Sequence, residues 1–353
     1  MPLRRSQAVA ILALFGLAAA VPKKRDASVC TEVRSRVPWT SLTSEEKDAY
    51  IAADLCLINA PSKLGIEGAV TRWDDLQWPH VVQSATVHDV GAFLPFHRYY
   101  MTAHERLIKD ECGYTGRMPY WDELADQGNM SSSEMWSTQY FGGNGRESDY
   151  CVVDGPFANL TLRWLQDGSV SEHCLTRIHN DSLLSSTSQA NIDKCNAIDN
   201  YTEAWECWKG GPHSGGHAAV GGIMLDGTLS PGDPVFYLHH SWLDLLWWRW
   251  QNLDIETRLT DMGGPNLPNV GGGPGGPGGS SNTTAVAASP GVPSNPSGVI
   301  GGTGPEFTDY FGDGGNTTTL NHRIYMAEIY PNVTIADLMD LNGEVICSEY
   351  LDD

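Results

Sequence analysis

Basic residues are scarce in this chain. Its 353 residues include 22 Lys and Arg against 43 Asp and Glu, which leaves a formal net charge of −21 at pH 7. Such a surface repels phosphate backbones and anionic lipid headgroups. We therefore expect neither a nucleic acid nor a membrane surface as a partner.

Long apolar runs are also scarce, and the one at the start is short. Residues 8–21 are apolar, rich in Ala and Leu, and follow Arg4 and Arg5. The run is too short for a typical membrane span. Its order of charged, then apolar, then small residues predicts a secretory signal peptide over residues 1–20, so we expect a secreted, extracellular protein.

A basic triplet stands directly behind this signal. Lys23, Lys24 and Arg25 are typical of a processing site, so residues 21–25 are interpreted as a short propeptide. The mature chain is then expected to begin near Asp26. A solvated cluster of charges is the alternative interpretation of the triplet.

No two cysteines have the Cys-x-x-Cys spacing of zinc ribbons or thioredoxin-like sites. An even number of cysteines in an exported chain predicts up to four disulfides, although spacing alone leaves their pairing open. The eight cysteines all lie beyond the predicted signal, at Cys30, Cys56, Cys112, Cys151, Cys174, Cys195, Cys207 and Cys347.

N-glycosylation sequons are frequent, and in a secreted chain they predict N-linked glycans on the surface. The seven sequon asparagines are Asn129, Asn159, Asn180, Asn200, Asn282, Asn316 and Asn332.

Alternating strand patterns are few, so the fold class predicted for the main domain, residues 26–262, is mainly α with loops and few short strands. Helical spacing of apolar residues predicts helices over residues 42–60, 94–109 and 238–253. Thr43 and Glu46 have the spacing of a capping box for the first helix. Residues 205–220 are expected to be partly helical, with an interruption at Gly210-Gly211-Pro212.

Residues 263–305 contain almost no large apolar side chain and are dominated by Gly, Pro, Ser and Asn. Such a composition cannot bury enough surface to order itself, so this tract is predicted to be a linker or a long surface loop. Residues 306–353 are too short to fold alone and are expected to pack on the main domain, where Cys347 could tie them down. Ile335, Leu338 and Met339 suggest a short amphipathic helix in this tail.

Histidine is the residue type whose distribution indicates chemistry. His80, His88 and His97 follow one another at intervals of eight and nine residues. Farther along, His213 and His217 are four residues apart, which places both imidazoles on one face of a helix. Either His239 or His240 completes a second group of three.

Two groups of three imidazoles predict two metal ions with open positions, which is the pattern of catalytic sites. Imidazole suits copper, and copper heads the affinity order of the divalent metals. Diiron and dizinc sites normally recruit carboxylates, and none stands at ligand spacing within His213–His217. A pair of copper ions is therefore the predicted cofactor, and a helix with two ordinary histidines is the alternative for His213 and His217 alone.

Several segments around these histidines resemble the tyrosinases, catechol oxidases and molluscan haemocyanins. Residues 93–99 (FLPFHRY) and 233–244 (DPVFYLHHSWLD) resemble the two copper signatures of that family, and residues 119–122 (PYWD) match another of its stretches. Residues 333–340 (VTIADLMD), followed by Cys347, resemble the end of the short secreted fungal tyrosinases. The resemblance covers about residues 39–350 except the Gly/Pro tract, and it implies a tyrosinase-like helical bundle around a dicopper site.

The resemblance also implies roles for individual residues. The first copper would be bound by His80, His88 and His97, and the second by His213, His217 and His240. His239 would then lie in the outer shell, where Phe93 and Phe236 are also expected, because each phenylalanine precedes a ligand by four residues. Arg98 and Asp233 would form an ion pair that ties the two halves together. The other four histidines, His104, His173, His179 and His322, are expected to be structural or to lie on the surface.

The sequence departs from the family at positions that affect phenol hydroxylation. Ser214 follows the first ligand of the second copper, where many tyrosinases carry Asn. A buried Glu upstream often holds a water molecule, and Glu203 or Glu206 could serve. Position 218 is a small Ala, and Thr86 stands where many relatives carry a cysteine linked to His88. These departures favour the oxidation of diphenols over strong monophenolase activity.

Three functions fit these features. The first is a copper oxidase that uses dioxygen as co-substrate to oxidise small phenolic substrates, namely o-diphenols and some monophenols or aminophenols, to quinones. The second is a tailoring oxidase that acts on a tyrosine-containing peptide or a phenolic metabolite in a fungal pathway. The third is a dioxygen-binding protein, which the single copy of the motifs disfavours. The oligomeric state is left open.

Overall fold

The computed structural model describes residues 30–267 and 311–351. The predicted signal peptide, the predicted propeptide and residues 268–305 of the predicted linker lie outside the described residues, as does Asn282. No helix in the described part of the chain combines the length and the apolar character that crossing a membrane requires.

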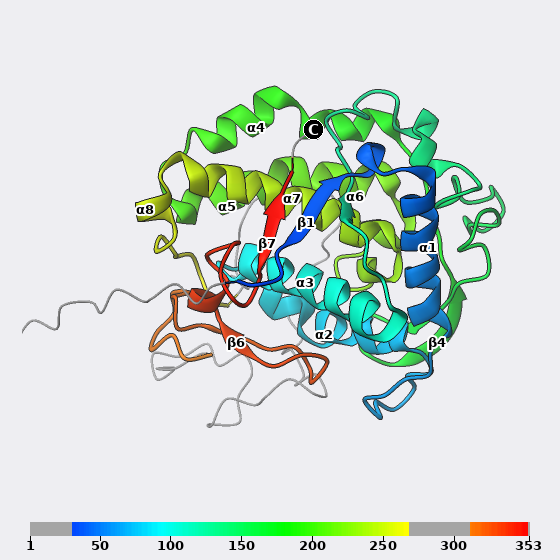
Figure 1. Cartoon of the computed structure of the whole chain (residues 1–353), viewed down its shortest axis with the longest axis horizontal. Coiled ribbons are helices and arrows are strands. Elements are labelled where there is room, and N and C mark those ends of the chain that lie inside the picture. Colours follow the sequence, from blue (N-terminus) through cyan, green and yellow to red (C-terminus); the bar gives the residue numbers. More distant parts are fainter. Residues whose placement is uncertain (1–29, 268–310, 352–353) are drawn as a thin grey trace, which may run out of the picture.

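The described chain is mostly helical with a few short strands, which confirms the predicted fold class (Figure 1). The helices are α1 (Ser44–Asn59), α2 (Arg72–Val87), α3 (Phe93–Cys112), α4 (Gln189–Asn196), α5 (Tyr201–Trp208), α6 (Ser214–Val220), α7 (Val235–Leu253) and α8 (Ile255–Arg258). The strands are β1 (Arg34–Pro38), β2 (Met118–Tyr120), β3 (Thr161–Trp164), β4 (Val170–Cys174), β5 (Arg323–Ile324), β6 (Val333–Thr334) and β7 (Ser348–Tyr350).

Three predicted helices correspond to α1, α3 and α7, and the predicted capping box of α1 is present. The Thr43 side chain accepts a hydrogen bond from the Glu46 amide, and the Glu46 carboxylate accepts one from the Thr43 amide. This reciprocal pair satisfies two of the amides that the first turn of a helix leaves free. α3 packs along α7, and α1 and α2 pack against each other and against α3, so that these four helices surround the core (Figure 1).

The prediction missed α2, although this helix carries His80. Pro79 lies in its interior, and a proline there removes one helical hydrogen bond and argues against a helix. The backbone departs from helical angles at Gln83, four residues after Pro79. Thr71 and Asp74 form a capping box at the start of α2, and this pair was the signal in the sequence that could have revealed the helix.

Gly210, Gly211 and Pro212 do not interrupt the helical backbone as predicted. Residues Lys209–His213 form a wider π-helical turn, η5, that joins α5 to α6. Pro212 has no amide hydrogen for an ordinary helical bond, which is consistent with the wider turn at this point. His213 is the last residue of this turn and is buried.

The C-terminal tail packs on the main domain. β7 and β2 flank β1, and both pair with β1 in parallel. The predicted amphipathic helix of the tail is only a 3-10 turn, η8 (Ile335–Asp337), but Ile335, Leu338 and Met339 are all buried.

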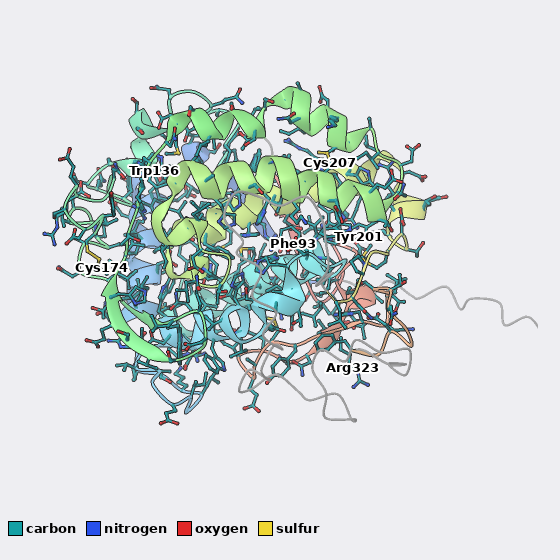
Figure 2. The ribbon with its side chains drawn as sticks, turned by 180° about the vertical axis from the view of Figure 1, so that it is seen from behind. Phe93, Trp136, Cys174, Tyr201, Cys207 and Arg323 are labelled. Atoms are coloured by element: carbon teal, nitrogen blue, oxygen red, sulfur yellow. A yellow bond between two sulfur atoms is a disulfide. The ribbon has the colours of Figure 1, made fainter. Side chains whose placement is uncertain are left out.

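All eight cysteines form disulfides, which confirms the prediction of up to four. The pairs are Cys30–Cys347, Cys56–Cys112, Cys151–Cys174 and Cys195–Cys207. Cys30–Cys347 ties the tail to the start of the described chain, next to the β1–β7 pair. Figure 2 shows Cys174 and Cys207 on opposite sides of the molecule, with Phe93 near its middle.

Candidate metal centre

Two helices and the residue that ends one of them supply the first group of histidines. His80 lies in α2, His88 is the C-cap residue of the same helix, and His97 lies in the second turn of α3. In each imidazole Nδ1 is bonded to a backbone carbonyl. The three partners are Thr228 O at 2.9 Å, Ser84 O at 2.8 Å and Phe93 O at 2.8 Å, respectively. A donating Nδ1–H fixes the tautomer and leaves the Nε2 lone pair free for a metal.

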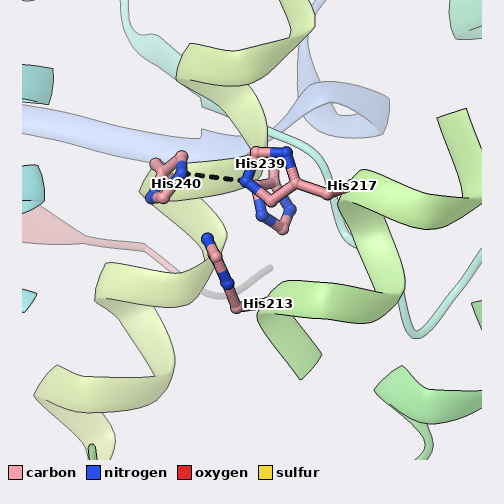
Figure 3. Close-up of side chains that lie close together, drawn as sticks. All are labelled: His213, His217, His239 and His240. Atoms are coloured by element: carbon pink, nitrogen blue, oxygen red, sulfur yellow. Dashed lines mark hydrogen bonds between the residues drawn. The ribbon is translucent and has the colours of Figure 1, made fainter. Parts of the chain in front are cut away.

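The second group comes from the π-helical turn, α6 and α7. His213 ends the turn, His217 follows in α6, and His239 and His240 are neighbours in α7. Nδ1 of His217 is bonded to the carbonyl of Met224, and its Nε2 lies 3.3 Å from Nε2 of His240. Figure 3 shows the four imidazoles of this group turned toward one another.

The two groups meet where α3 packs against α7, because His97 lies in α3 and His240 lies in α7. The rings of His97 and His240 are stacked, with centroids 4.2 Å apart and planes 10° apart. Phe93 lies 4.7 Å from the His97 ring and 4.8 Å from the His213 ring, and Phe236 lies 4.2 Å from the His240 ring. Both phenylalanines are fully buried, so they exclude water from the space between the groups.

The electrostatics keep these imidazoles neutral. Burial lowers the pKa of all seven histidines in the two groups, and it brings the pKa of His217 to about 4. Metal binding requires neutral imidazoles, because protonation occupies the lone pair. At neutral pH the site therefore presents nitrogen donors without first having to lose protons.

The donor set fits copper. Within each group the possible ligand atoms lie within 4.8 Å of one another, and within the described residues both groups consist of histidine alone. Nε2 of His80, Nε2 of His97 and both ring nitrogens of His213 are buried without a hydrogen-bond partner in the described structure. Buried polar atoms are rarely left unpaired, and a bound metal explains several such atoms at one point.

Glu123 was missed by the sequence reasoning. It is fully buried, and its Oε1 contacts Nδ1 of His239. Burial, with smaller contributions from Asp122 and Asp126, raises the pKa of Glu123 well above its usual value. Glu123 directly follows the PYWD stretch in the sequence. This position alone was weak evidence for a role at the site, because only the folded chain brings the segment beside α7.

The predicted carboxylates of α5 do not form a buried water site. Glu203 and Glu206 are exposed, while the buried positions of α5 are Tyr201, Ala204, Trp205 and Trp208. The prediction that either carboxylate holds a buried water molecule is therefore wrong. The helix turns its aromatic side chains inward. Ala204, which lies between the two carboxylates in the sequence, also faces the interior, whereas Glu203 and Glu206 face solvent.

The other departures from the family are located as follows. Ser214 is exposed, and its hydroxyl donates to the carbonyl of Lys209 at 2.7 Å. Ala218 is half-buried. Thr86 donates to the carbonyl of Gln83, and no cysteine is free to form a thioether with His88. Lys209 also pairs with Asp89, the residue after His88, and so links the segments that carry the two groups.

The predicted ion pair between Arg98 and Asp233 is wrong in its partner. Arg98 pairs with Asp244, one helical turn beyond His240, and Asp233 pairs with Arg177. Both pairs are buried. Asp233 stands just before α7, where its carboxylate also accepts a hydrogen bond from the Val235 amide.

The remaining histidines have structural surroundings. Nε2 of His104 is bonded to Asp54 at 2.7 Å, and Nδ1 of His322 to Asp313 at 2.7 Å. His179 packs edge-on against Trp136, and His173 lies in β4 at the surface hairpin.

Comparisons with known proteins agree with this geometry. Residues 70–253 match the common central domain of tyrosinase. The tyrosinase-like protein phomQ1 of Diaporthe leptostromiformis is 36% identical over 261 residues, which cover 67% of this chain and 66% of that protein. Tyrosinase ustQ of Aspergillus flavus is 32% identical over 257 residues, which cover 69% of this chain and 71% of that protein. The match thus spans about two thirds of these relatives. A polyphenol oxidase of Thermothelomyces thermophila has the same fold, with a TM-score of 0.70 at 24% identity, over 90% of this chain and 89% of that one.

Proposed function

The chain belongs to the tyrosinase family, and from this premise we propose that it is a copper oxidoreductase that uses dioxygen to oxidise o-diphenols to quinones. The observation that carries the proposal is the pair of buried histidine groups that face each other, with the His97 and His240 rings stacked at the boundary. His80, His88 and His97 would hold one copper, and His213, His217 and His240 the other.

Copper bound in the two groups would supply the one-electron steps that join the reduction of dioxygen to the oxidation of a phenol. The chain supplies the rest. The carbonyls of Thr228, Ser84 and Phe93 orient the first three imidazoles, and burial keeps the imidazoles neutral. Phe93 and Phe236 keep the space between the groups dry, which protects reactive species from water.

Diphenols are the favoured substrates because proton acceptors are poorly placed for monophenols. A catechol loses two electrons and two protons to become a quinone, whereas hydroxylation of a monophenol also needs a positioned base or water. The Ser214 hydroxyl is engaged with a backbone carbonyl, and Glu203 and Glu206 are exposed. His88 is half-buried and Ser214 is exposed, so we propose that a small phenol approaches the site from this side.

A tailoring oxidase is the second candidate, because the matched relatives are fungal tyrosinase-like proteins. Its substrate would be a tyrosine-containing peptide or a phenolic metabolite rather than a free catechol.

We also propose that the chain is secreted and carries N-linked glycans. All six sequon asparagines in the described residues are exposed, which supports glycan attachment. Treatment with an N-glycosidase should lower the apparent mass of the secreted protein.

The assay that tests the function compares free catechols, monophenols and aminophenols with the copper-loaded protein. Dioxygen uptake and quinone absorbance should both appear with catechols. Ser214→Asn should raise the ratio of monophenol to diphenol turnover several-fold, because the longer amide can hold a water molecule. Absence of turnover with every free catechol would overturn the first candidate and favour the tailoring oxidase. Reversible dioxygen binding without quinone would favour a dioxygen-binding protein.

A further inference from the structure

The histidine site is less buried on one side than on the other. His88 is half-buried, and His213 and His217 are 9% and 8% exposed. The other three proposed ligands are at most 2% exposed: His80, His97 and His240. A substrate that enters from solvent therefore passes His88, His213 and His217 first, and the side chains beside these three decide which substrates are admitted.

Lys209 lies at this side of the site and is tied to both segments that carry the exposed ligands. Its Nζ pairs with Oδ1 of Asp89 at 2.5 Å, and Asp89 directly follows His88. Its carbonyl accepts a hydrogen bond from the Ser214 hydroxyl at 2.7 Å, and Ser214 directly follows His213. The lysine is thus anchored between one ligand of the first group and one of the second.

The ammonium of Lys209 is the inner charge of the pair. Its side chain is 26% exposed, whereas that of Asp89 is 66% exposed. Nζ lies 5.0 Å from the centre of the buried Trp205 ring, and a cation over an indole face is stabilised. Trp205 in turn lies 6.3 Å from Phe93, whose ring contacts that of His213. The indole therefore holds the ammonium close to the site independently of Asp89.

Positive charge is otherwise scarce around this opening. The two segments that carry the exposed ligands, residues 84–92 and 201–229, contain one lysine and no arginine, in a chain whose net charge is −21. Charges more than about 8 Å away are largely screened at physiological ionic strength, so Lys209 acts on a bound substrate more strongly than the distant acidic residues do. An ammonium has three N–H donors, and one of them serves Asp89, which leaves donors for a second carboxylate.

We propose that Lys209 is a specificity-determining residue that binds the carboxylate of a catechol with an acidic side arm. The inference rests on the proposed function and names its substrate class, which is anionic phenols rather than neutral or cationic ones. The contact is partly exposed to solvent, so the preference over an uncharged catechol is expected to be about fivefold rather than absolute.

The test compares two catechols that differ in charge, dihydrocaffeate, whose arm ends in a carboxylate, and ethylcatechol, whose arm is neutral. The quantity is the ratio of their kcat/KM values with the copper-loaded protein. Lys209→Met keeps the apolar stem over Trp205 and should lower the ratio about fivefold, through the KM of dihydrocaffeate. Asp89→Asn should raise the ratio, because the ammonium then lacks its own counter-charge. A purely structural tie would be broken by both variants alike, so shifts in the same direction, or none, would overturn the proposal.

A second exposed ion pair provides a matched control. Lys109 pairs with Glu32 at 3.0 Å, and both side chains are exposed. Lys109 lies twelve residues after His97 in α3, which is about 18 Å along the helix. Lys109→Met changes the net charge by the same amount as Lys209→Met but should leave the ratio unchanged. An equal fall in both variants would show a general effect of charge and contradict the role of Lys209.

Binding without turnover gives an independent measurement. Phenylpropionate and phenylpropanol have no phenolic hydroxyl, and calorimetric titration gives their dissociation constants. The native chain should bind the carboxylate about fivefold more tightly than the alcohol, and Lys209→Met should remove this difference. Equal affinities in the native chain would refute the inference, as would a preference for dopamine over ethylcatechol that Asp89→Asn abolishes. A native chain that oxidises neither catechol would instead overturn the proposed function.

Discussion

Arg98 joins three segments that are distant in the chain. Its guanidinium pairs with Asp244 and donates to the carbonyl of Leu338 at 3.1 Å, to that of Met339 at 2.9 Å and to the side chain of Gln251 at 3.0 Å. α3, α7 and the C-terminal tail meet at this one side chain, next to His97.

Arg98→Ala should lower the free energy of unfolding by about 3–5 kcal/mol, because it leaves the Asp244 carboxylate buried with one partner fewer. Denaturant unfolding measures the loss. The control is Arg146→Ala, since the pair of Arg146 with Asp149 is exposed and should change stability by less than about 1 kcal/mol. Similar small losses in both variants would contradict the assigned role of Arg98.

His179 gives the stability a defined pH dependence. Burial, and then the nearby Arg177, lowers the pKa of His179 from 6.5 to about 4, so the folded protein keeps it neutral where the unfolded chain binds a proton. Its contribution is complete above pH 6.5 and is lost as the pH falls toward 4, by at most about 3 kcal/mol. His179→Gln should therefore lose less stability than the native chain between pH 6.5 and 4. A parallel loss in both proteins would contradict this explanation.

The sequence singled out all seven histidines that the fold gathers into the two groups, with His239 assigned to the outer shell, because motifs and spacing are local properties. It could not identify Glu123 or the partner of Arg98. Both contacts depend on how the segment after β2 packs on α7 and how α3 packs on α7. The spacing of residues along the chain does not show this packing. The prediction that Glu203 or Glu206 of α5 is buried failed for a related reason. A shift of one residue along a helix decides whether a side chain faces the interior or solvent, and the sequence did not determine that register.

At the scale of elements, the helices were predictable where apolar residues recur at helical spacing, as in α1, α3 and α7. α2 was missed because Pro79 opposes a helix locally, and tertiary packing holds it nonetheless. The strand pairing of β7 with β1 was also out of reach, because it joins the two ends of the described chain.

The β1–β7 pair is locked by Cys30–Cys347, whose cysteines are 317 residues apart. Replacement of both cysteines by serine should lower the free energy of unfolding by about 2–5 kcal/mol, because the bond closes a long loop in the unfolded chain. The matched control is the pair Cys195 and Cys207, only 12 residues apart, where the loss should be smaller. Thermal unfolding of the two double variants compares them, and a larger loss in the control would contradict this reasoning.

At the scale of the whole molecule, two segments of the chain build one centre. Residues 80–97 carry the first histidine group and residues 213–240 the second, and the packing of α3 along α7 brings the groups together. Backbone carbonyls, two buried phenylalanines and a buried carboxylate surround these imidazoles, and several of the ring nitrogens between the groups have no hydrogen-bond partner in the described residues. The two groups are therefore expected to hold one copper each.

Copper content per chain tests this claim most directly. Metal analysis of the copper-loaded protein should find about two coppers in the native chain, and about one in His97→Ala and in His213→Ala. The double variant should retain almost none. A native chain with far fewer than two coppers, or variants that keep both, would contradict the account.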